Sequence, residues 1–255
     1  MPGTAIRLDI ADGTARITLD GPATRNALDA AAAGELIAAC DRVDADDSVG
    51  VVVLTGAHGA FCSGADTTVL NRLRSVAPHE AYDGLNDLYA AFRRVGALAV
   101  PSVAVVDGPA VGAGVNLALA ADLRIVTHEA IFVSGFARIG LHPGGGHLHL
   151  LARAAGVRSA TAAGVFAQTI TAQQAVATGL AADLVTPADI SQTVAHATEH
   201  LAADPALARA LVETLRRTVL DPTAWDRAIE IERARQMWSL SRPRPHARQH
   251  AVKES

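Results

Sequence analysis

Cysteine is scarce in this sequence: Cys40 and Cys62 are the only two among 255 residues. Neither belongs to a Cys-x-x-Cys pair or has a histidine at a metal-ligand spacing. Disulfide frameworks and zinc motifs both depend on such patterns. We therefore expect two reduced thiols and predict no metal site.

The sequence also lacks a strong charge imbalance and a long uninterrupted apolar run. The net charge is −4 and the isoelectric point about 6.2, which provides no basic surface for nucleic acid. The apolar region at 98–126 is interrupted by Pro101, Asp107, Pro109 and Asp122, so it is typical of a buried core and not of a membrane span. The N-terminal residues do not show the basic-then-apolar order of a signal peptide. We expect a cytoplasmic protein without membrane contact.

The first third of the chain shows alternating strand and helix patterns. Half of all residues are apolar, enough for one sizeable core, although the length allows one domain or two. Alternating apolar residues on either side of Asp12-Gly13 predict a β-hairpin. A helix is expected up to about residue 43. A second helical pattern covers 67–99 and has four apolar side chains on one face: Leu85, Leu88, Tyr89 and Phe92.

Residues 100–147 contain the most informative stretch. The β-branched run at 103–106 predicts a buried strand, and Asp107-Gly-Pro109 predicts a turn. After Gly112 and Gly114, a small-residue helix is expected at 115–121. This arrangement leaves unpaired N–H groups at the start of a helix, where they attract a phosphate or a developing oxyanion.

A second loop of the same kind lies upstream. Residues 51–54 predict a strand, residues 55–66 form a glycine-containing loop, and a helix is expected from Thr67. Two loops that each offer a backbone N–H are what an oxyanion hole for an acyl thioester requires.

These two loops carry a family resemblance. Residues 61–66 (Phe-Cys-Ser-Gly-Ala-Asp) and 108–114 (Gly-Pro-Ala-Val-Gly-Ala-Gly) together resemble the enoyl-CoA hydratase/isomerase, or crotonase, superfamily. The resemblance implies that the oxyanion donors are the N–H groups of Ala65 and Ala113. Residues 25–28 resemble the family's coenzyme A loop, which implies that Arg25 and Ala27 lie beside the coenzyme A. A solvated arginine before a helix remains the alternative for Arg25.

The resemblance also implies a fold and an assembly. We expect an α/β protein with a crotonase-type ββα spiral core at 1–186 and a C-terminal helical trimerisation region at 187–255. Strands are expected at 122–126 and 130–133, and mainly helices from 147 onward, apart from the helix and short strand implied for 171–185. The tail at 242–250 is predicted to be mobile and could lie near a neighbour's coenzyme A. The family implies a homotrimer or hexamer, and an acyl-CoA substrate without a permanently bound cofactor.

The acid/base residues depart from the family pattern. Hydratases of this family use two glutamates to activate and deliver water, and the matching positions hold Asn116 and Phe136. Neither side chain can act as a base near neutral pH. The carboxylates between 103 and 150 are Asp107, Asp122 and Glu129, which fall at predicted turns and strand edges. The two-glutamate mechanism is therefore not supported.

Other residues could replace the missing glutamates. Arg138, His142, His147 and His149 lie close together in sequence, and histidine is the natural base at pH 7. We rank His142 first; a loop histidine bonded to the backbone is the alternative. Ser63 and Cys62 have no recognisable base partner, and Asp66 is expected to cap the helix that starts at Thr67.

Two classes of function remain open. The first is an enzyme acting on an acyl-CoA thioester through an enolate, by isomerisation, decarboxylation or hydrolysis rather than two-glutamate hydration. The second is an acyl-CoA-binding protein that has lost the chemistry. A dinucleotide-binding fold is disfavoured because the third glycine of its motif would be Leu117.

Overall fold

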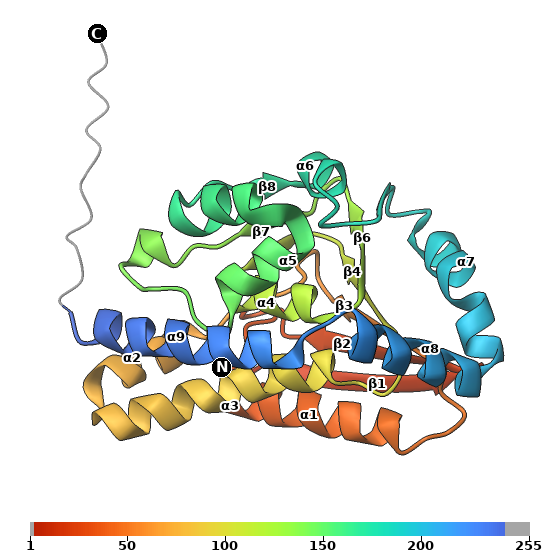
Figure 1. Ribbon diagram of the computed structural model, residues 1–255, viewed down its shortest axis with the longest axis horizontal. Coiled ribbons are helices and arrows are strands. Elements are labelled where there is room, and N and C mark those ends of the chain that lie inside the picture. The colour runs from red at the N-terminus through yellow and green to blue at the C-terminus, as the bar shows by residue number, and fades with distance from the viewer. Residues whose placement is uncertain (1–2, 243–255) are drawn as a thin grey trace, which may run out of the picture.

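The computed structural model describes residues 3–242 and has a six-stranded sheet at its centre, in the order β1-β2-β3-β4-β6-β9. β1 is antiparallel to β2, and all the other neighbours are parallel. The strands are β1 (Ala5–Ala11), β2 (Thr14–Asp20), β3 (Val51–Gly56), β4 (Ser102–Val106), β6 (Leu123–Thr127) and β9 (Asp183–Val185). Figure 1 shows this sheet enclosed by helices.

The predicted N-terminal hairpin is confirmed. β1 and β2 pair from Ala5–Asp20 to Ala11–Thr14, and the connecting residues Asp12 and Gly13 have φ values of 48° and 73°. Two successive residues with positive φ form the type I′ turn, whose twist matches that of antiparallel strands.

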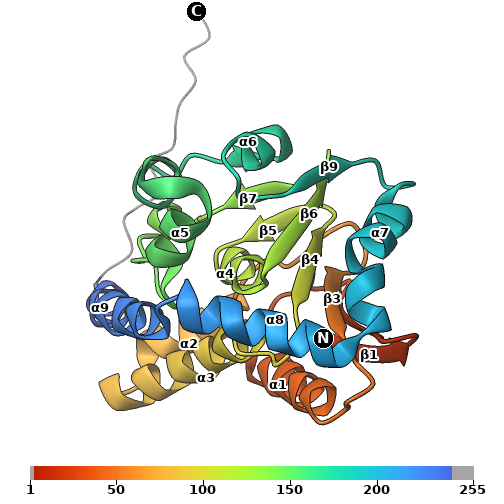
Figure 2. The ribbon, with the colours of Figure 1, turned by 45° about the vertical axis from the view of Figure 1, so that its right-hand side comes forward.

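The central strands read as continuous apolar runs because both faces of the sheet are covered. Side chains alternate along a strand, so Val51 and Val53 on β3 pack with Val194 of α7 (Ile190–Ala203). Val52 and Leu54 point to the opposite face, into the cluster that includes α1 (Ala30–Asp44). Figure 2 shows α7 and α1 on these two sides.

The helical pattern at 67–99 forms two helices and not one. α2 (Thr67–Ser75) ends before Ala77, whose ψ of 150° is extended, and α3 (Pro78–Gly96) begins at the proline. A residue before proline is pushed out of the helical region, whereas proline itself suits the first helical position. The predicted apolar face is confirmed, because Leu85, Leu88, Tyr89 and Phe92 are all buried.

A three-stranded second sheet, β5-β7-β8, stands beside the main one. Its strands are β5 (Pro109–Val111), β7 (Ile131–Val133) and β8 (Ile170–Thr171). β7 was predicted, but β5 and β8 were not. β5 begins within the turn that was predicted at Asp107-Gly-Pro109, and the two residues of β8 are too few to show alternation. Between β5 and β6 lies α4 (Ala113–Ala120), which starts two residues earlier than predicted.

Helices dominate the rest of the described chain, as expected. They are the 3₁₀ helix η1 (Ala137–Ile139), α5 (His147–Ala160), the π-helix η2 (Thr161–Val165), α6 (Ala172–Ala177), α8 (Pro205–Thr218) and α9 (Pro222–Leu240). α9 contacts α3 and α5, so the chain folds back over the region between them (Figure 1). The predicted mobile tail lies outside the described residues, except Arg242. Within residues 3–242, no helix is long and apolar enough to cross a membrane.

Candidate active site

Two loops, one after β3 and one after β4, meet at the centre of the molecule. The N–H groups of Phe61 and Cys62 donate to the carbonyl oxygen of Pro109 at 3.1 and 3.2 Å, and the Val111 N–H donates to the Cys62 oxygen at 2.9 Å. A Cβ atom on Gly114 would lie 2.1 Å from that Cys62 oxygen. Only glycine permits this approach, so the absence of a side chain at Gly114 allows the two loops to pack against each other.

The N–H groups of Ala65 and Ala113 are left over at this junction. Their neighbours are satisfied: the Asp66 N–H donates to Leu28 at 2.9 Å and the Gly112 N–H to Val133 at 2.8 Å. Ala113 is the first residue of α4, where an N–H has no partner within the helix. Among the backbone hydrogen bonds of residues 3–242 outside helices and strands, none is donated by the N–H group of Ala65 or Ala113. A Cβ on Gly64 would lie 3.4 Å from the Ala113 nitrogen, so the two loops are in direct contact.

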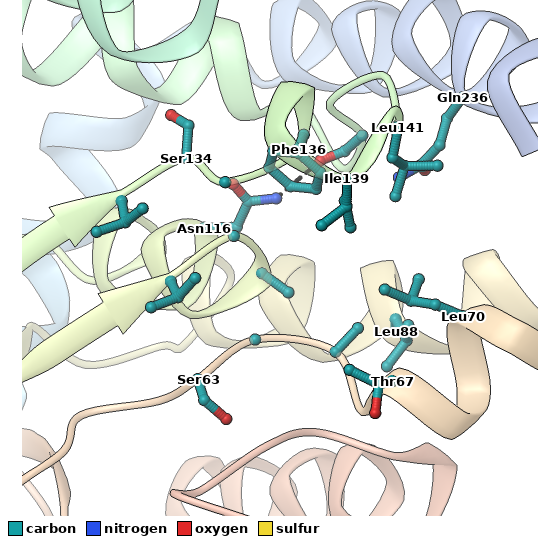
Figure 3. A pocket seen from close by; sticks show the side chains of 18 of the residues that line it. Ser63, Thr67, Leu70, Leu88, Asn116, Ser134, Phe136, Ile139, Leu141 and Gln236 are labelled. Carbon is teal, nitrogen blue, oxygen red and sulfur yellow. Dashed lines mark hydrogen bonds between the residues drawn. The ribbon is translucent and has the colours of Figure 1, made fainter. Parts of the chain in front are cut away.

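A cavity of about 330 Å³ opens beside these two groups and includes both alanines in its lining. Its wall is mainly apolar, with Leu70, Leu88, Val133, Phe136, Ile139 and Leu141 among the lining residues (Figure 3). Arg138 is the one charged residue of the lining, and its guanidinium donates to the Ala167 oxygen at 2.8 Å. The cavity therefore suits an apolar chain that carries one polar group to be held by the N–H pair.

The loop that resembles a coenzyme A site is fixed by a residue that sequence analysis did not single out. Asn26 is fully buried; its amide donates to the carbonyl oxygens of Ala57 and Ala60, both at 2.8 Å, and accepts from the Gly21 N–H at 2.8 Å. Arg25 is exposed, has a positive φ of 51° and makes no ion pair in the described part of the chain. Ala27 is buried, and its carbonyl oxygen accepts from Thr4 at 2.6 Å.

The structure brings Asn116 and Phe136 together in the cavity wall, where the sequence match places the two glutamates. Asn116 donates through Nδ2 to the Gly144 oxygen at 2.8 Å, and its Oδ1 lies 2.6 Å from Nδ1 of His147. The ring of Phe136 meets the His147 imidazole edge-on, with centroids 4.9 Å apart. No carboxylate and no histidine belongs to the lining of this cavity.

His147 lies directly behind this wall and is fully buried. Since Asn116 uses Nδ2 on Gly144, its Oδ1 accepts, and His147 must carry its proton on Nδ1. The unprotonated Nε2 then accepts from the Ser134 hydroxyl, 2.7 Å away. Burial lowers the pKa of His147 to about 3, so the imidazole is neutral at pH 7. In Figure 3 the Ser134 hydroxyl points away from the open cavity.

A buried carboxylate holds the start of α5. Glu232 of α9 accepts from the N–H groups of His147 at 2.7 Å and Leu148 at 2.9 Å. A carboxylate at a helix N-terminus satisfies unpaired N–H groups and interacts well with the helix dipole. Burial nevertheless raises the pKa of Glu232 to about 7, against the lowering effect of these backbone hydrogen bonds.

His142, which sequence analysis ranks first as a base, does not belong to the lining of this cavity, and its role as a base stays a prediction. Its Nδ1 lies 2.7 Å from the carbonyl oxygen of Pro143, and it lines a second cavity of about 290 Å³ beside Trp238 and Ser239. The Ser239 hydroxyl accepts from the His142 N–H at 2.9 Å, which holds the loop on α9. The contact with Pro143 is the one expected for a backbone-bonded loop histidine, the alternative interpretation.

The other candidates behave as expected. Asp66 caps α2 by accepting from the Thr68 N–H at 2.7 Å. Burial raises the pKa of the Cys62 thiol to about 12, so it is not a thiolate near neutral pH. The Ser63 hydroxyl donates to the Thr24 oxygen at 2.7 Å.

Comparison with known proteins decides the family. A family model described as enoyl-CoA hydratase/isomerase matches residues 9–242. The chain belongs to the enoyl-CoA hydratase/isomerase family. It is 39% identical over 227 residues to a protein of Mycobacterium tuberculosis H37Rv named probable enoyl-CoA hydratase EchA14, covering 89% of this chain and 85% of that one.

Family members with other names are similar as well. The chain is 30% identical over 210 residues to 4-chlorobenzoyl coenzyme A dehalogenase-2 of Arthrobacter sp., which covers 82% of this chain and 76% of the relative. The crystal structure of an enoyl-CoA hydratase/isomerase from Xanthobacter autotrophicus Py2 superposes with a TM-score of 0.86 at 27% identity, over 95% of this chain and 90% of that chain. The expected crotonase fold is thereby confirmed, and membership in the family alone does not fix the reaction.

Proposed function

We propose that this chain is an enzyme that binds an acyl-CoA thioester, with the thioester oxygen between the N–H groups of Ala65 and Ala113. The observation that carries the proposal is the pair of unpartnered N–H groups at the edge of an apolar cavity. Coenzyme A would enter as part of the substrate, along the loop of Arg25 and Ala27, and no resident cofactor is required. The names of the relatives, which include acyl-CoA enzymes, support the same substrate class.

Two N–H donors aimed at one oxygen favour negative charge there. When a carboxyl group leaves carbon 2 as carbon dioxide, the electron pair of the broken bond moves onto the thioester oxygen and forms an enolate. Donors of this kind contribute about 3–4 kcal/mol each to transition-state stabilisation. Because the cavity lining contains no carboxylate, the proposed reaction is one of the family's enolate chemistries other than two-glutamate hydration.

A complex with acyl-CoA tests this proposal directly. We expect a crystal structure with butanoyl-CoA to place the thioester oxygen about 2.7–3.2 Å from both alanine nitrogens. The carbonyl stretch of ¹³C-labelled ligand should move to lower frequency when the ligand binds, because the hydrogen bonds polarise the bond. A ligand whose carbonyl oxygen lies out of reach of both nitrogens would show that the proposal is wrong.

A second candidate function is acyl-CoA binding without turnover. It is favoured by the neutral, fully buried His147 and by the absence of any acid or histidine from the cavity lining. Measurement of acyl-CoA affinity alongside turnover of crotonyl-CoA and other short acyl-CoAs separates the two functions. Binding with turnover of none of them supports this second candidate.

We further propose that residues 1–186 form the catalytic core and that residues 187–255 support assembly into a trimer or hexamer. What supports this is an apolar stripe on α8: Leu207, Leu211 and Leu215 are 53%, 53% and 44% exposed. Large apolar side chains at every fourth position of a helix are typical of a surface covered by a partner.

A further inference from the structure

A further cavity, of about 410 Å³, lies where α8 meets α9, and its lining shares no residue with that of the cavity at Ala65 and Ala113. Figure 2 shows α8 running into α9 below α4. We call it the arginine cavity, because its charged and aromatic lining residues are Arg153, Arg216, Arg217, Asp122, Asp221 and Trp225. We propose that the arginine cavity binds a phosphate group, either free or carried by a small organic ester.

Both aspartates of the arginine cavity already have partners of their own. Asp122 forms an ion pair with Arg216 at 3.2 Å, and it accepts from the Ser102 N–H and hydroxyl at 2.9 and 2.8 Å. Asp221 caps the N-terminus of α9 and forms an ion pair with Arg227 at 3.3 Å. These two carboxylates therefore do not neutralise the remaining arginines.

Arg153 has no carboxylate partner. Its one hydrogen bond within residues 3–242 is a long one, 3.4 Å to the Leu119 oxygen, and it forms no ion pair there. The neighbouring Arg124 donates to the backbone oxygens of Leu180 and Ala121, at 2.5 and 2.7 Å, and to no carboxylate. Burial, and after it the positive charge of Arg153, lowers the pKa of Arg124 to about 10. Cations that lie together without a counter-ion create a positive potential, which attracts an anion.

The guanidinium of Arg153 lies over an aromatic ring that is itself held in place. Its Cζ atom is 5.9 Å from the centre of the Trp225 ring, within the distance of a cation–π interaction. The indole donates through Nε1 to the Gly145 oxygen at 3.0 Å. Added Cβ atoms on Gly96 and Gly146 would lie 2.6 and 2.4 Å from the indole, so it packs closely against backbone at both ends. A donor that is ordered in advance loses less conformational entropy when a ligand binds.

A second guanidinium makes phosphate the best match. Arg217 lines the same cavity from α8, and its ion pair with Glu213 is a surface contact between side chains that are 79% and 59% exposed. Such a pair contributes little to stability, so Arg217 is available to a ligand. A phosphate monoester carries a charge of about −1.5 to −2 at pH 7 and has three acceptor oxygens, which suit bidentate guanidinium donors. The cavity volume is typical of sites for organic ligands.

The arginine cavity opens on a different face of α8 from the apolar stripe. The stripe Leu207, Leu211 and Leu215 repeats every four residues, whereas Arg216 and Leu220 of the cavity belong to a neighbouring row of the helix. Assembly through the stripe therefore does not use these cavity residues.

Calorimetric titration of the full-length protein, in phosphate-free buffer of low ionic strength, tests the proposal. The probes are inorganic phosphate and glycerol 3-phosphate, with glycerol as the uncharged control. We expect both phosphates to bind with a Kd on the order of 0.1–1 mM and glycerol not to bind. Binding should weaken in about 0.5 M NaCl, because salt screens the charges. The ratio of the two affinities identifies the source of the phosphate group, and binding of either probe supports the proposal.

Two variants locate the binding site. Arg153→Met keeps the apolar part of the side chain and removes the charge, so it should bind both phosphates about tenfold more weakly or worse. Arg158→Met is the matched control, because Arg158 is an exposed arginine of the same helix α5 outside the cavity lining. It should keep the affinity of the wild type within about twofold.

Fluorescence gives a second measurement that does not depend on a variant of Arg153. The chain has two tryptophans, so in Trp238→Phe the emission comes from Trp225. Addition of phosphate should change this emission with the same midpoint as the calorimetric titration, because the ligand binds the guanidinium that lies on the indole.

Three results would overturn the proposal: no binding of either phosphate up to about 10 mM, equal affinities of the wild type and Arg153→Met, or unchanged Trp225 emission at saturating phosphate. None of these results bears on the proposed acyl-CoA function, because the two cavities share no lining residue.

Discussion

The Nδ1–H of His147 donates to Oδ1 of Asn116 at 2.6 Å, joining the first residue of α5 to the middle of α4. Both side chains are buried, and each has its remaining polar atom bonded elsewhere, His147 to Ser134 and Asn116 to Gly144. The position that matches a hydratase glutamate is thus part of a closed hydrogen-bond network. This contact stabilises the cavity wall and fixes the orientation of the Asn116 amide within it.

Replacement of His147 should lower the free energy of unfolding. His147→Leu leaves the Asn116 oxygen and the Ser134 hydroxyl without their partner inside the protein, and each buried unsatisfied group costs about 1–3 kcal/mol. We expect the free energy of unfolding to fall by about 2–4 kcal/mol in urea titration. His142→Ala, whose side chain bonds only its neighbouring carbonyl group, should change it by less than about 0.5 kcal/mol. Equal effects of the two substitutions would contradict the network.

Hydration of 2-enoyl-CoA should be weak in the wild type. Each missing acid/base group removes about 10²–10⁴ in rate, and the wall holds Asn116 and Phe136 at those positions. The double variant Asn116→Glu/Phe136→Glu should hydrate crotonyl-CoA faster than the wild type, as followed by loss of enoyl absorbance. Wild-type turnover of about 10 per second or more, the median for enzymes, would contradict this expectation.

The pH dependence of stability should change when Glu232 is replaced. Burial raises its pKa from 4.5 to about 7, so the folded state retains a proton that the unfolded chain releases. The stabilisation is complete below pH 4.5 and is lost as the pH rises through 7, at most about 3 kcal/mol.

His147 opposes this dependence, because its pKa falls from 6.5 to about 3. The stabilisation that His147 contributes to the folded state is lost as the pH falls from 6.5 toward 3. Between pH 4.5 and 6.5, the stability gained through His147 as the pH rises partly offsets the stability lost through Glu232. In Glu232→Gln, unfolding free energies measured across this interval should therefore rise with pH more steeply than in the wild type. Parallel curves for the two proteins would exclude a raised Glu232 pKa.

The close approach of the two loops can be tested at a glycine. Gly114→Ala would put a Cβ 2.1 Å from the Cys62 oxygen, so the loops must separate. We expect a loss of about 1–3 kcal/mol in stability and weaker acyl-CoA binding. Gly34→Ala is the matched control, because nothing lies within 4 Å of its added Cβ on α1; it should stabilise the protein by about 0.5–1 kcal/mol. If Gly114→Ala binds acyl-CoA with unchanged affinity, the close contact between the two loops is not required for binding.

Self-association should depend on the apolar stripe of α8. Leu211 is 53% exposed between Leu207 and Leu215, and an aspartate there would be buried against a partner. We expect sedimentation to show a trimer or hexamer for the wild type and smaller species for Leu211→Asp. Glu213→Ala, on the same helix, serves as the control. A wild type that sediments as a monomer at micromolar concentration would contradict the proposed assembly.

Much of the fold could be predicted from the sequence, because it depends on local patterns. The Asp12-Gly13 turn, the buried face of α3 and the cap at Asp66 each need only a few neighbouring residues. The two glycine turns predicted where the loops after β3 and β4 would lie. Two short strands escaped prediction: β5 begins within the predicted turn at Asp107-Gly-Pro109, and the two residues of β8 carry no period.

Only part of the candidate site could be predicted from the sequence. The family resemblance identified Asn116 and Phe136 as the positions without glutamate. The sequence also places four basic residues at 138–149, but it does not show which of them face inward. Tertiary packing decided that. His142 bonds its own neighbour, whereas His147 meets Asn116, 31 residues away, and Glu232, 85 residues away. Such contacts have no local signal, because burial and side-chain direction depend on how distant helices pack against one another.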